Sequence, residues 1–131
     1  MPELDTIIDV DASPIADERF VSRCRDQLDA DGVVTIPGFI RPAELKALVA
    51  EAAAEKNNAY FTASTHNAYL TPPRDDLPAN HVFNRQITSS KGCITTDQVP
   101  RSSALHSIYD SPVFQQFLAT VVGETALYEY A

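Results

Sequence analysis

The sequence has few cysteines and none of the spacings that cysteine chemistry requires. Its 131 residues include only Cys24 and Cys93, which lie far apart in segments of different character, and no Cys-x-x-Cys pair occurs. A thiolate zinc site or a dithiol redox motif is therefore not supported. Two isolated cysteines in a chain without a secretory signal indicate reduced thiols, so we expect a cytoplasmic location.

Positive charge and long apolar runs are also scarce. The sequence has ten Lys and Arg residues and eighteen Asp and Glu residues, which gives a net charge of −8. A basic face for a nucleic-acid backbone or an anionic membrane surface is therefore not expected. No run approaches the roughly 18 apolar residues of a membrane span. The acidic start, MPELDTIIDVDASP, also lacks the pattern of a secretory signal. We expect neither nucleic acid nor a membrane as a partner.

The common signatures of hydrolases and nucleotide-binding proteins are missing too. The sequence contains no Gly-x-Ser-x-Gly, no phosphate-binding loop and no Cys-His arrangement. What remains is an ordinary globular composition, 44% hydrophobic and 21% charged, in a chain long enough for one domain. Residues 1–31 carry a net charge of −6 and residues 61–131 only −2. The second half is the better place for anion recognition.

Apolar residues recur at helical spacing in four segments. Capping residues bound them: Ser13-Pro14 and Ser111-Pro112 are helix starts, and Gly32 and Gly123 are helix ends. Residues 1–12 precede these segments and are expected to form a flexible acidic leader or a short edge strand. The predicted helices span residues 14–29, 42–56, 102–109 and 112–123.

Strand patterns are short and scattered. The predicted strands are residues 33–36, residues 83–87 and the closing ALYEYA of residues 126–131. Residues 60–80 contain three prolines without periodicity, which predicts a long loop. So few strands cannot close a barrel, and a final strand without a neighbour is an edge that can be paired. We expect a single domain over residues 13–131 that is incomplete or is completed by another chain.

Four polar residues in the stretch from Val82 to Pro100 are candidates for binding a small-molecule substrate. Arg85 is a candidate carboxylate clamp, although a surface or ion-paired arginine is the alternative. Lys91 lies in a predicted Ser-Ser-Lys-Gly turn that can bind an anion, and an exposed turn explains it equally well. Asp97 and Gln98 can order a loop at a site, but we favour their capping the next helix.

The three histidines do not form a metal site in the sequence pattern. His66 and His81 flank the proline-containing loop and are expected to be solvated, and His106 is expected to be half-buried on a short helix. Four tyrosines can line a pocket, but packing in the core and strands is the commoner use. These are Tyr60, Tyr69, Tyr128 and Tyr130.

Several segments follow one another in a characteristic order, which begins with a helix, then GVVTIPGFI, then RPAELKALVAEA. Further on come NAYLTP, SSKG, DQVP and the closing SPVFQQFLATVVGETALYEYA. Together they resemble the amino-terminal part of the phytanoyl-CoA-dioxygenase-like branch of the Fe(II)/2-oxoglutarate oxygenases. The similarity covers residues 20–131 and extends to a bacterial subgroup with hydroxylase-like and amino-acid-halogenase-like members.

The resemblance implies a double-stranded β-helix, or jelly-roll, core of α+β class behind an N-terminal helical platform. It also implies Fe(II) held by a His-x-Asp or His-x-Gly pair and a distal His, with 2-oxoglutarate chelating the metal. Two imidazoles and a carboxylate on one face of the iron leave three positions open for the co-substrate and O₂. The reaction implied is hydroxylation or halogenation of a small molecule.

The chain departs from this pattern at the metal ligands. Its histidines are followed by Asn-Ala, Val-Phe and Ser-Ile, so none begins a His-x-Asp, His-x-Glu or His-x-Gly motif. The resemblance implies that the ligands and the 2-oxoglutarate-binding Arg lie past Ala131. We expect an inactive, marginally stable amino-terminal segment that binds neither Fe(II) nor 2-oxoglutarate alone. The alternative is a non-catalytic helical interaction module that pairs its terminal strand with a partner or with itself.

Overall fold

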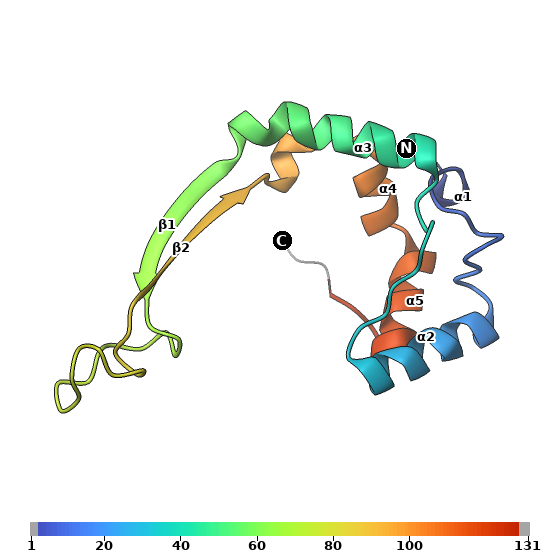
Figure 1. Cartoon of the computed structure of the whole chain (residues 1–131). Helices are drawn as coiled ribbons and strands as arrows, with labels where there is room; N and C mark the ends of the chain where they lie inside the picture. Colours follow the sequence, from blue (N-terminus) through green and yellow to red (C-terminus); the bar gives the residue numbers. More distant parts are fainter. Residues whose placement is uncertain (1–2, 129–131) are drawn as a thin grey trace. The chain divides into compact units, whose positions relative to one another are not determined.

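The computed structural model describes residues 3–128, which form two compact units (Figure 1). Of the described residues, the helical unit contains residues 3–54 and 99–128, and the hairpin unit spans Glu55–Gln98. Helices and a two-stranded antiparallel sheet are both present, so the predicted α+β class is confirmed. The single domain predicted over residues 13–131 stays a prediction, because two compact units can belong to one domain.

Residues 3–12 are packed into the helical unit. A short helix, α1 (Leu4–Ile7), precedes Ile8, and the side chains of Ile7 and Ile8 are fully buried. Ile8 also forms an isolated antiparallel bridge with Ile40. The predicted flexible leader is therefore not observed in these residues, because their apolar side chains supply part of the core.

The next helix, α2 (Glu18–Asp31), begins four residues later than the sequence indicated. The carboxylate of Asp17 accepts a hydrogen bond from the backbone N–H of Phe20 at 2.9 Å, so Asp17 rather than Ser13 is the N-cap. Ser13 is itself buried, with 1% of its surface exposed. The predicted end is confirmed: Gly32 closes the helix in the left-handed conformation, at φ 71°.

Residues 33–36 do not form the predicted strand. They run as an extended segment without a partner strand, and the Val33 side chain is 57% exposed. The β-branched run has no neighbouring strand to donate to, so it forms no sheet. The helix predicted next is confirmed as α3 (Pro42–Glu55).

The last two helices begin directly after the serines that the sequence indicates as their caps. Ser103 caps α4 (Ala104–Tyr109), and Ser111 caps α5 (Pro112–Val122), which ends at Gly123 with φ 79°. Helix α5 packs against α2, as Figure 1 shows, and the rings of Phe20 and Phe117 are 6.1 Å apart. This pair anchors a core whose buried members are Ile7, Ile8, Ile15, Phe20, Cys24, Ala104, Phe117 and Val121.

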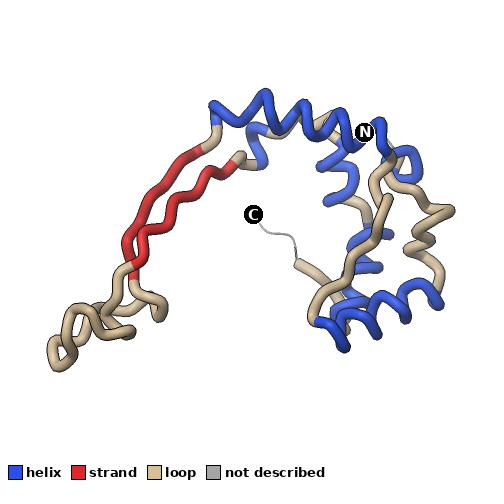
Figure 2. The backbone as a smooth tube through the Cα atoms, in the orientation of Figure 1, coloured by secondary structure: helices blue, strands red, loops and turns tan. Residues whose placement is uncertain are grey.

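The hairpin unit contains both strands of the sheet (Figure 2). β1 (Tyr60–His66) pairs antiparallel with β2 (Ile87–Cys93), from Tyr60 opposite Cys93 to His66 opposite Ile87. The short 3₁₀ turns η1 (Lys56–Asn58) and η2 (Thr96–Gln98) lie before β1 and after β2.

Three predictions for this region are wrong. Residues 60–66 were expected in a loop but form β1, and the strand expected over residues 83–87 begins only at Ile87. The predicted Ser-Ser-Lys-Gly turn of residues 89–92 lies inside β2. Neither strand shows a clean apolar–polar alternation in its own sequence, so periodicity did not reveal them.

The closing strand predicted over residues 126–131 is not observed in its described part. Residues 126–128 have no strand conformation, and residues 129–131 lie outside the described residues.

No helix in the described part of the chain is long and apolar enough to cross a membrane.

Candidate functional site

The most exposed ordered element of the chain is the β1–β2 hairpin, and the loop that joins its strands is folded. Asn67 follows β1 directly, with 1% of its surface exposed. Its side-chain oxygen accepts hydrogen bonds from the backbone N–H groups of Tyr69 at 3.1 Å and Thr71 at 3.0 Å. Asparagine favours this local pairing, so Asn67 fixes the turn that leaves β1.

A second buried asparagine holds the far part of the loop. The side-chain oxygen of Asn84 accepts from the backbone N–H of Arg74 at 2.7 Å. Its NH₂ group donates to the carbonyl oxygens of Arg74 at 2.8 Å, Leu77 at 3.0 Å and Pro78 at 3.3 Å. One side chain therefore satisfies backbone groups on four peptide units, which makes Asn84 the main tie across residues 74–84.

Charged and aromatic side chains cover the outside of this loop. The guanidinium of Arg74 pairs with the carboxylate of Asp76, and this hydrogen bond lowers the pKa of Asp76. The same guanidinium lies 5.7 Å from the ring centre of Phe83, which stacks on Tyr69 at 4.8 Å. Because Arg74 already has an acidic partner and an aromatic partner, it is not available as a free anion site.

The two faces of the hairpin follow from its register, since directly opposite residues lie on the same face. One face carries Tyr60, Cys93, Thr62, Lys91, Ser64, Ser89, His66 and Ile87. The other carries Phe61, Gly92, Ala63, Ser90, Thr65 and Thr88. Hydroxyl pairs cross the strands, with 3.4 Å between the Oγ atoms of Ser64 and Ser89.

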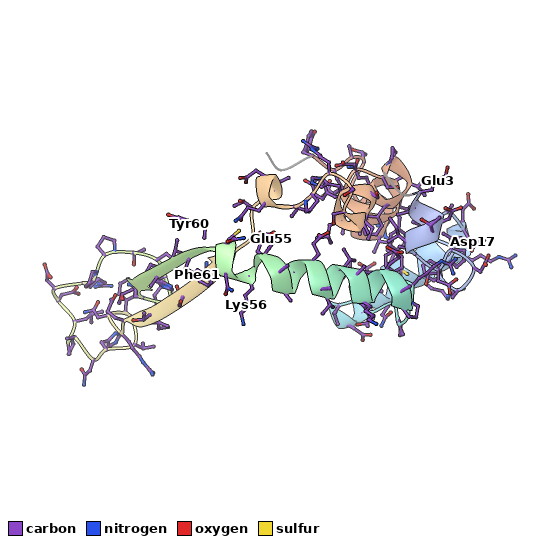
Figure 3. All side chains as sticks on the ribbon, turned by 90° about the horizontal axis from the view of Figure 1, so that it is seen from above. Glu3, Asp17, Glu55, Lys56, Tyr60 and Phe61 are labelled. Atoms are coloured by element: carbon purple, nitrogen blue, oxygen red, sulfur yellow. The ribbon has the colours of Figure 1, made fainter. Side chains whose placement is uncertain are left out.

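Both faces of the hairpin are open to solvent. Twelve of the fourteen strand residues are exposed, including Tyr60 at 68% and Phe61 at 63%. Figure 3 shows both aromatic residues at the start of β1. Within residues 3–128, no third strand pairs with either outer edge of the sheet. An isolated two-stranded sheet is marginal in water, so the hairpin is a surface that further protein can complete.

The four predicted substrate-binding residues all lie in the hairpin unit but do not form a cluster. Arg85 is exposed at the end of the loop, and Lys91 lies in β2 opposite Thr62. No hydrogen bond or ion pair observed among the described side chains joins Arg85, Lys91 and Asp97. Substrate binding by these residues stays a prediction, whereas the anion-binding turn at Lys91 is wrong because the backbone there is paired in a strand.

The predicted capping role of Asp97 and Gln98 is also wrong. Helix α4 is capped by Ser103, whose Oγ accepts from the backbone N–H of Leu105 at 3.2 Å. Gln98 instead orders its own turn: its side-chain oxygen accepts from the backbone N–H of Thr95 at 2.8 Å. Its NH₂ group donates to the carbonyl oxygen of Asn58. Gln98 thus ties the segment after β2 to the segment before β1.

The histidines have separate structural surroundings. His66 is half-buried at the end of β1, with its ring nitrogens 2.9 Å from the carbonyl oxygen of Asn67 and 3.3 Å from Ser89 Oγ. The solvated loop position predicted for His66 is therefore wrong, although His81 is exposed as expected. His106 is more buried than predicted, with 6% exposure and one ring nitrogen 3.3 Å from the carbonyl oxygen of Val99.

Two further expectations concern metal ligands and tyrosines. Among the described residues there is no group of three or more His, Cys, Asp or Glu that could hold a metal ion. Tyr60, Tyr69 and Tyr128 are 68%, 57% and 94% exposed, so none of them lies in the core. Tyr60 lies in strand β1, as the strand-packing expectation allows, and Tyr128 lines a small surface pocket. Tyr130 lies outside the described residues.

Helix α3 of the helical unit has no fully buried residue. None of the fourteen described residues of α3 is buried, although Leu45 and Val49 recur at helical spacing with 49% and 61% exposure. Two features hold the helix in place: the half-buried Leu48 packs against the core, and Ser103 Oγ donates to a carboxylate oxygen of Glu51 at 2.7 Å. The exposure of Leu45 and Val49 is unusual, because the apolar face of a helix is normally packed along its whole length.

The two residues that organise the hairpin loop were not predicted from the sequence. In the sequence, Asn67 and Asn84 resemble ordinary turn residues. The spacing of residues along the chain shows neither that they are buried nor which backbone groups they bind. A usable signal was the content of β1, since YFTASTH is rich in aromatic and β-branched residues.

Comparison with known proteins gives no relative. No protein-family model matches the chain, and no curated protein or solved structure does so either.

Proposed function

We propose that this chain forms the helical platform and first strands of a protein similar to the Fe(II)/2-oxoglutarate oxygenases. The jelly-roll core, the iron ligands and the 2-oxoglutarate site of that protein would come from sequence beyond Ala131. Its reaction would be hydroxylation or halogenation of a small molecule. The proposal starts from the resemblance of residues 20–131 to that family.

The observation that supports it best is the partly uncovered apolar stripe of α3, of which Leu48 packs on the core while its neighbours stay exposed. Leu45 and Val49 lie one turn apart on this helix and are both about half exposed or more. A platform helix that packs on a jelly-roll sheet requires such a stripe. The exposed hairpin fits the same role, because an antiparallel pair with two open edges can be extended into a larger sheet.

The chain's own chemistry in this role would be recognition. Arg85 and Lys91 are exposed cations in the hairpin unit, and an anionic substrate group is what they would attract. The chain would supply no metal ligand and no proton-transfer group. Iron activation would be the work of the jelly-roll part.

The test begins with the DNA that follows codon 131. We expect it to encode a His-x-Asp, His-x-Glu or His-x-Gly motif and a later His. The longer protein should then show the metal-to-ligand charge-transfer band when Fe(II) and 2-oxoglutarate are added without oxygen. A variant with Ala at the first His of that motif is the control and should lack the band. Absence of the motif, or a band from residues 1–131 alone, would refute the proposal.

A second function is favoured by a different observation, the solvent exposure of both faces and both edges of the hairpin. A non-catalytic module that binds by adding strands would have this property. The strand first expected to pair, residues 126–131, has no strand conformation over residues 126–128. In this alternative the pairing element is therefore the hairpin. Chromatography of the purified chain tests it: a discrete folded oligomer supports it, and polydisperse aggregate contradicts it.

A further inference from the structure

The two outer edges of the hairpin are not equally protected against strand addition. β2 carries Lys91 and Gly92, and lysine and glycine both discourage the pairing of an edge strand. β1 reads YFTASTH and contains no Lys, Arg, Asp, Glu, Pro or Gly. Six of its seven residues are exposed. β1 is therefore the edge at which a further strand can bind.

We propose that β1 is a homodimerisation strand, and that two copies of this chain join β1 to β1 in antiparallel orientation. A two-fold axis beside Ala63 brings all seven residues of each strand into register. The product is a four-stranded sheet in the order β2–β1–β1–β2. The inference does not depend on the oxygenase proposal, because it uses only the hairpin of the chain described here.

The sequence of β1 is complementary to itself in this register. Tyr60 lies opposite His66 of the second copy, Phe61 opposite its Thr65, and Thr62 opposite its Ser64. Aromatic side chains thus meet a histidine and a β-branched residue, and hydroxyls meet hydroxyls, which are favourable cross-strand pairs. No pair places like charges opposite each other, because β1 carries no acidic or basic residue other than His66.

One face of the four-stranded sheet gains a continuous apolar centre. Phe61 and Ala63 lie on the same face of the hairpin, and the Phe61 ring covers Gly92 so closely that a Cβ there would be 2.7 Å from it. The two-fold axis places the Ala63 residues side by side, with a Phe61 ring toward each end. The exposed ring thereby acquires neighbours that the single hairpin does not provide.

Charge also favours a second copy as the partner. The hairpin unit, residues 55–98, has four acidic and four basic residues and is therefore neutral, although the whole chain carries −8. A neutral surface lets two copies approach despite the acidic helical unit. The only edges left after pairing are those of β2, where Lys91 and Gly92 oppose further addition. The assembly should therefore stop at the dimer.

Mass measurement tests the proposal with a matched pair of variants. We expect wild-type chain to have twice the 14.3 kDa mass of one copy in sedimentation equilibrium, with reversible dissociation on dilution. Ala63→Lys places two lysines opposite each other at the axis and should abolish the doubling. Ser90→Lys is the control, because Ser90 faces Ala63 within the hairpin but lies on β2, and it should remain dimeric. Circular dichroism should give the same helix content for all three.

A cross-link reports the register directly. In a background with Cys93→Ser, Ala63→Cys should form a disulfide-linked dimer on mild oxidation. Paired residues have Cα atoms about 4.5 to 5.5 Å apart, within the range that a disulfide spans. Ser90→Cys in the same background should not cross-link, because three strand spacings of about 4.8 Å separate the two copies there.

Several results would overturn the proposal. A wild-type chain that stays monomeric at all concentrations excludes the dimer. Equal loss of the dimer in Ala63→Lys and Ser90→Lys excludes β1 as the joining edge. Masses that grow beyond two copies indicate β1-to-β2 pairing, which is open-ended, and equal cross-linking of both cysteine variants excludes the two-fold register.

Discussion

Phe117→Ala should unfold the helical unit under conditions in which the wild-type chain is folded. Phe117 is 4% exposed, and its ring lies 6.1 Å from Phe20 and 6.2 Å from Phe114. It therefore joins α5 to α2 and to the rest of a small core. Replacing a buried phenylalanine with alanine costs about 3 to 5 kcal/mol, from lost apolar burial and the cavity that remains.

That loss is large beside the total stability. Domains of this size unfold with about 5 to 15 kcal/mol, so a loss of about 3 to 5 kcal/mol removes between roughly a fifth and all of that stability. Urea unfolding followed by far-UV circular dichroism measures the difference, and the thermal midpoint should fall by at least about 12 °C.

The matched control is Phe61→Ala, which removes the same atoms from a side chain that is 63% exposed. It should change the stability of the helical unit by less than about 0.5 kcal/mol when measured at concentrations that keep the chain monomeric. A loss below about 1 kcal/mol for Phe117→Ala, or equal losses for both variants, would refute the assignment of this core.

Three further predictions concern the hairpin unit and the thiols. Asn84→Ala removes four hydrogen bonds and should speed hydrogen exchange and proteolysis within residues 67–86, while the helical unit melts as before; unchanged exchange in the loop would contradict its role as the tie. The exposed thiol of Cys93 should react rapidly with an alkylating reagent. Burial raises the pKa of the Cys24 thiol, so Cys24 should stay unmodified until the chain unfolds. Equal alkylation rates for both thiols would be evidence against the packing of α2. Because Arg74 lowers the pKa of Asp76, the ion pair orders the loop above the usual carboxyl pKa and is lost as the pH falls through the lowered value. A carboxyl-carbon NMR titration should show a higher Asp76 midpoint in Arg74→Gln, and an unchanged midpoint would contradict this.

Helix ends were largely predictable because their chemistry is local. Ser111 precedes Pro112 and its hydroxyl binds the N–H three residues on, while Gly32 and Gly123 adopt the left-handed conformation. The exception is instructive. Ser13-Pro14 carries the same start signal as Ser111-Pro112, but Asp17 offers a competing cap nearer to the apolar stripe.

Strand pairing was not predictable, because it depends on residues far away in the chain. His66 pairs with Ile87 across a twenty-residue loop, and neither strand alternates cleanly between apolar and polar residues. The loop seemed irregular in the sequence because its order comes from Asn67 and Asn84, whose partners are mostly backbone groups. Backbone partners leave no trace in side-chain spacing, so the architecture of this loop could not be predicted.

The oxygenase and dimer proposals both involve β1, and one substitution distinguishes their consequences. In a longer oxygenase-like protein, a later strand of the same chain would pair with the free edge of β1 and occupy the dimer surface. That protein should be monomeric both with and without Ala63→Lys, because a single lysine beside a different residue meets no like charge. In the 131-residue chain the same substitution should halve the mass. If the longer protein is a dimer that Ala63→Lys dissociates, its β1 edge is free, and the hairpin then lies at the margin of any larger sheet.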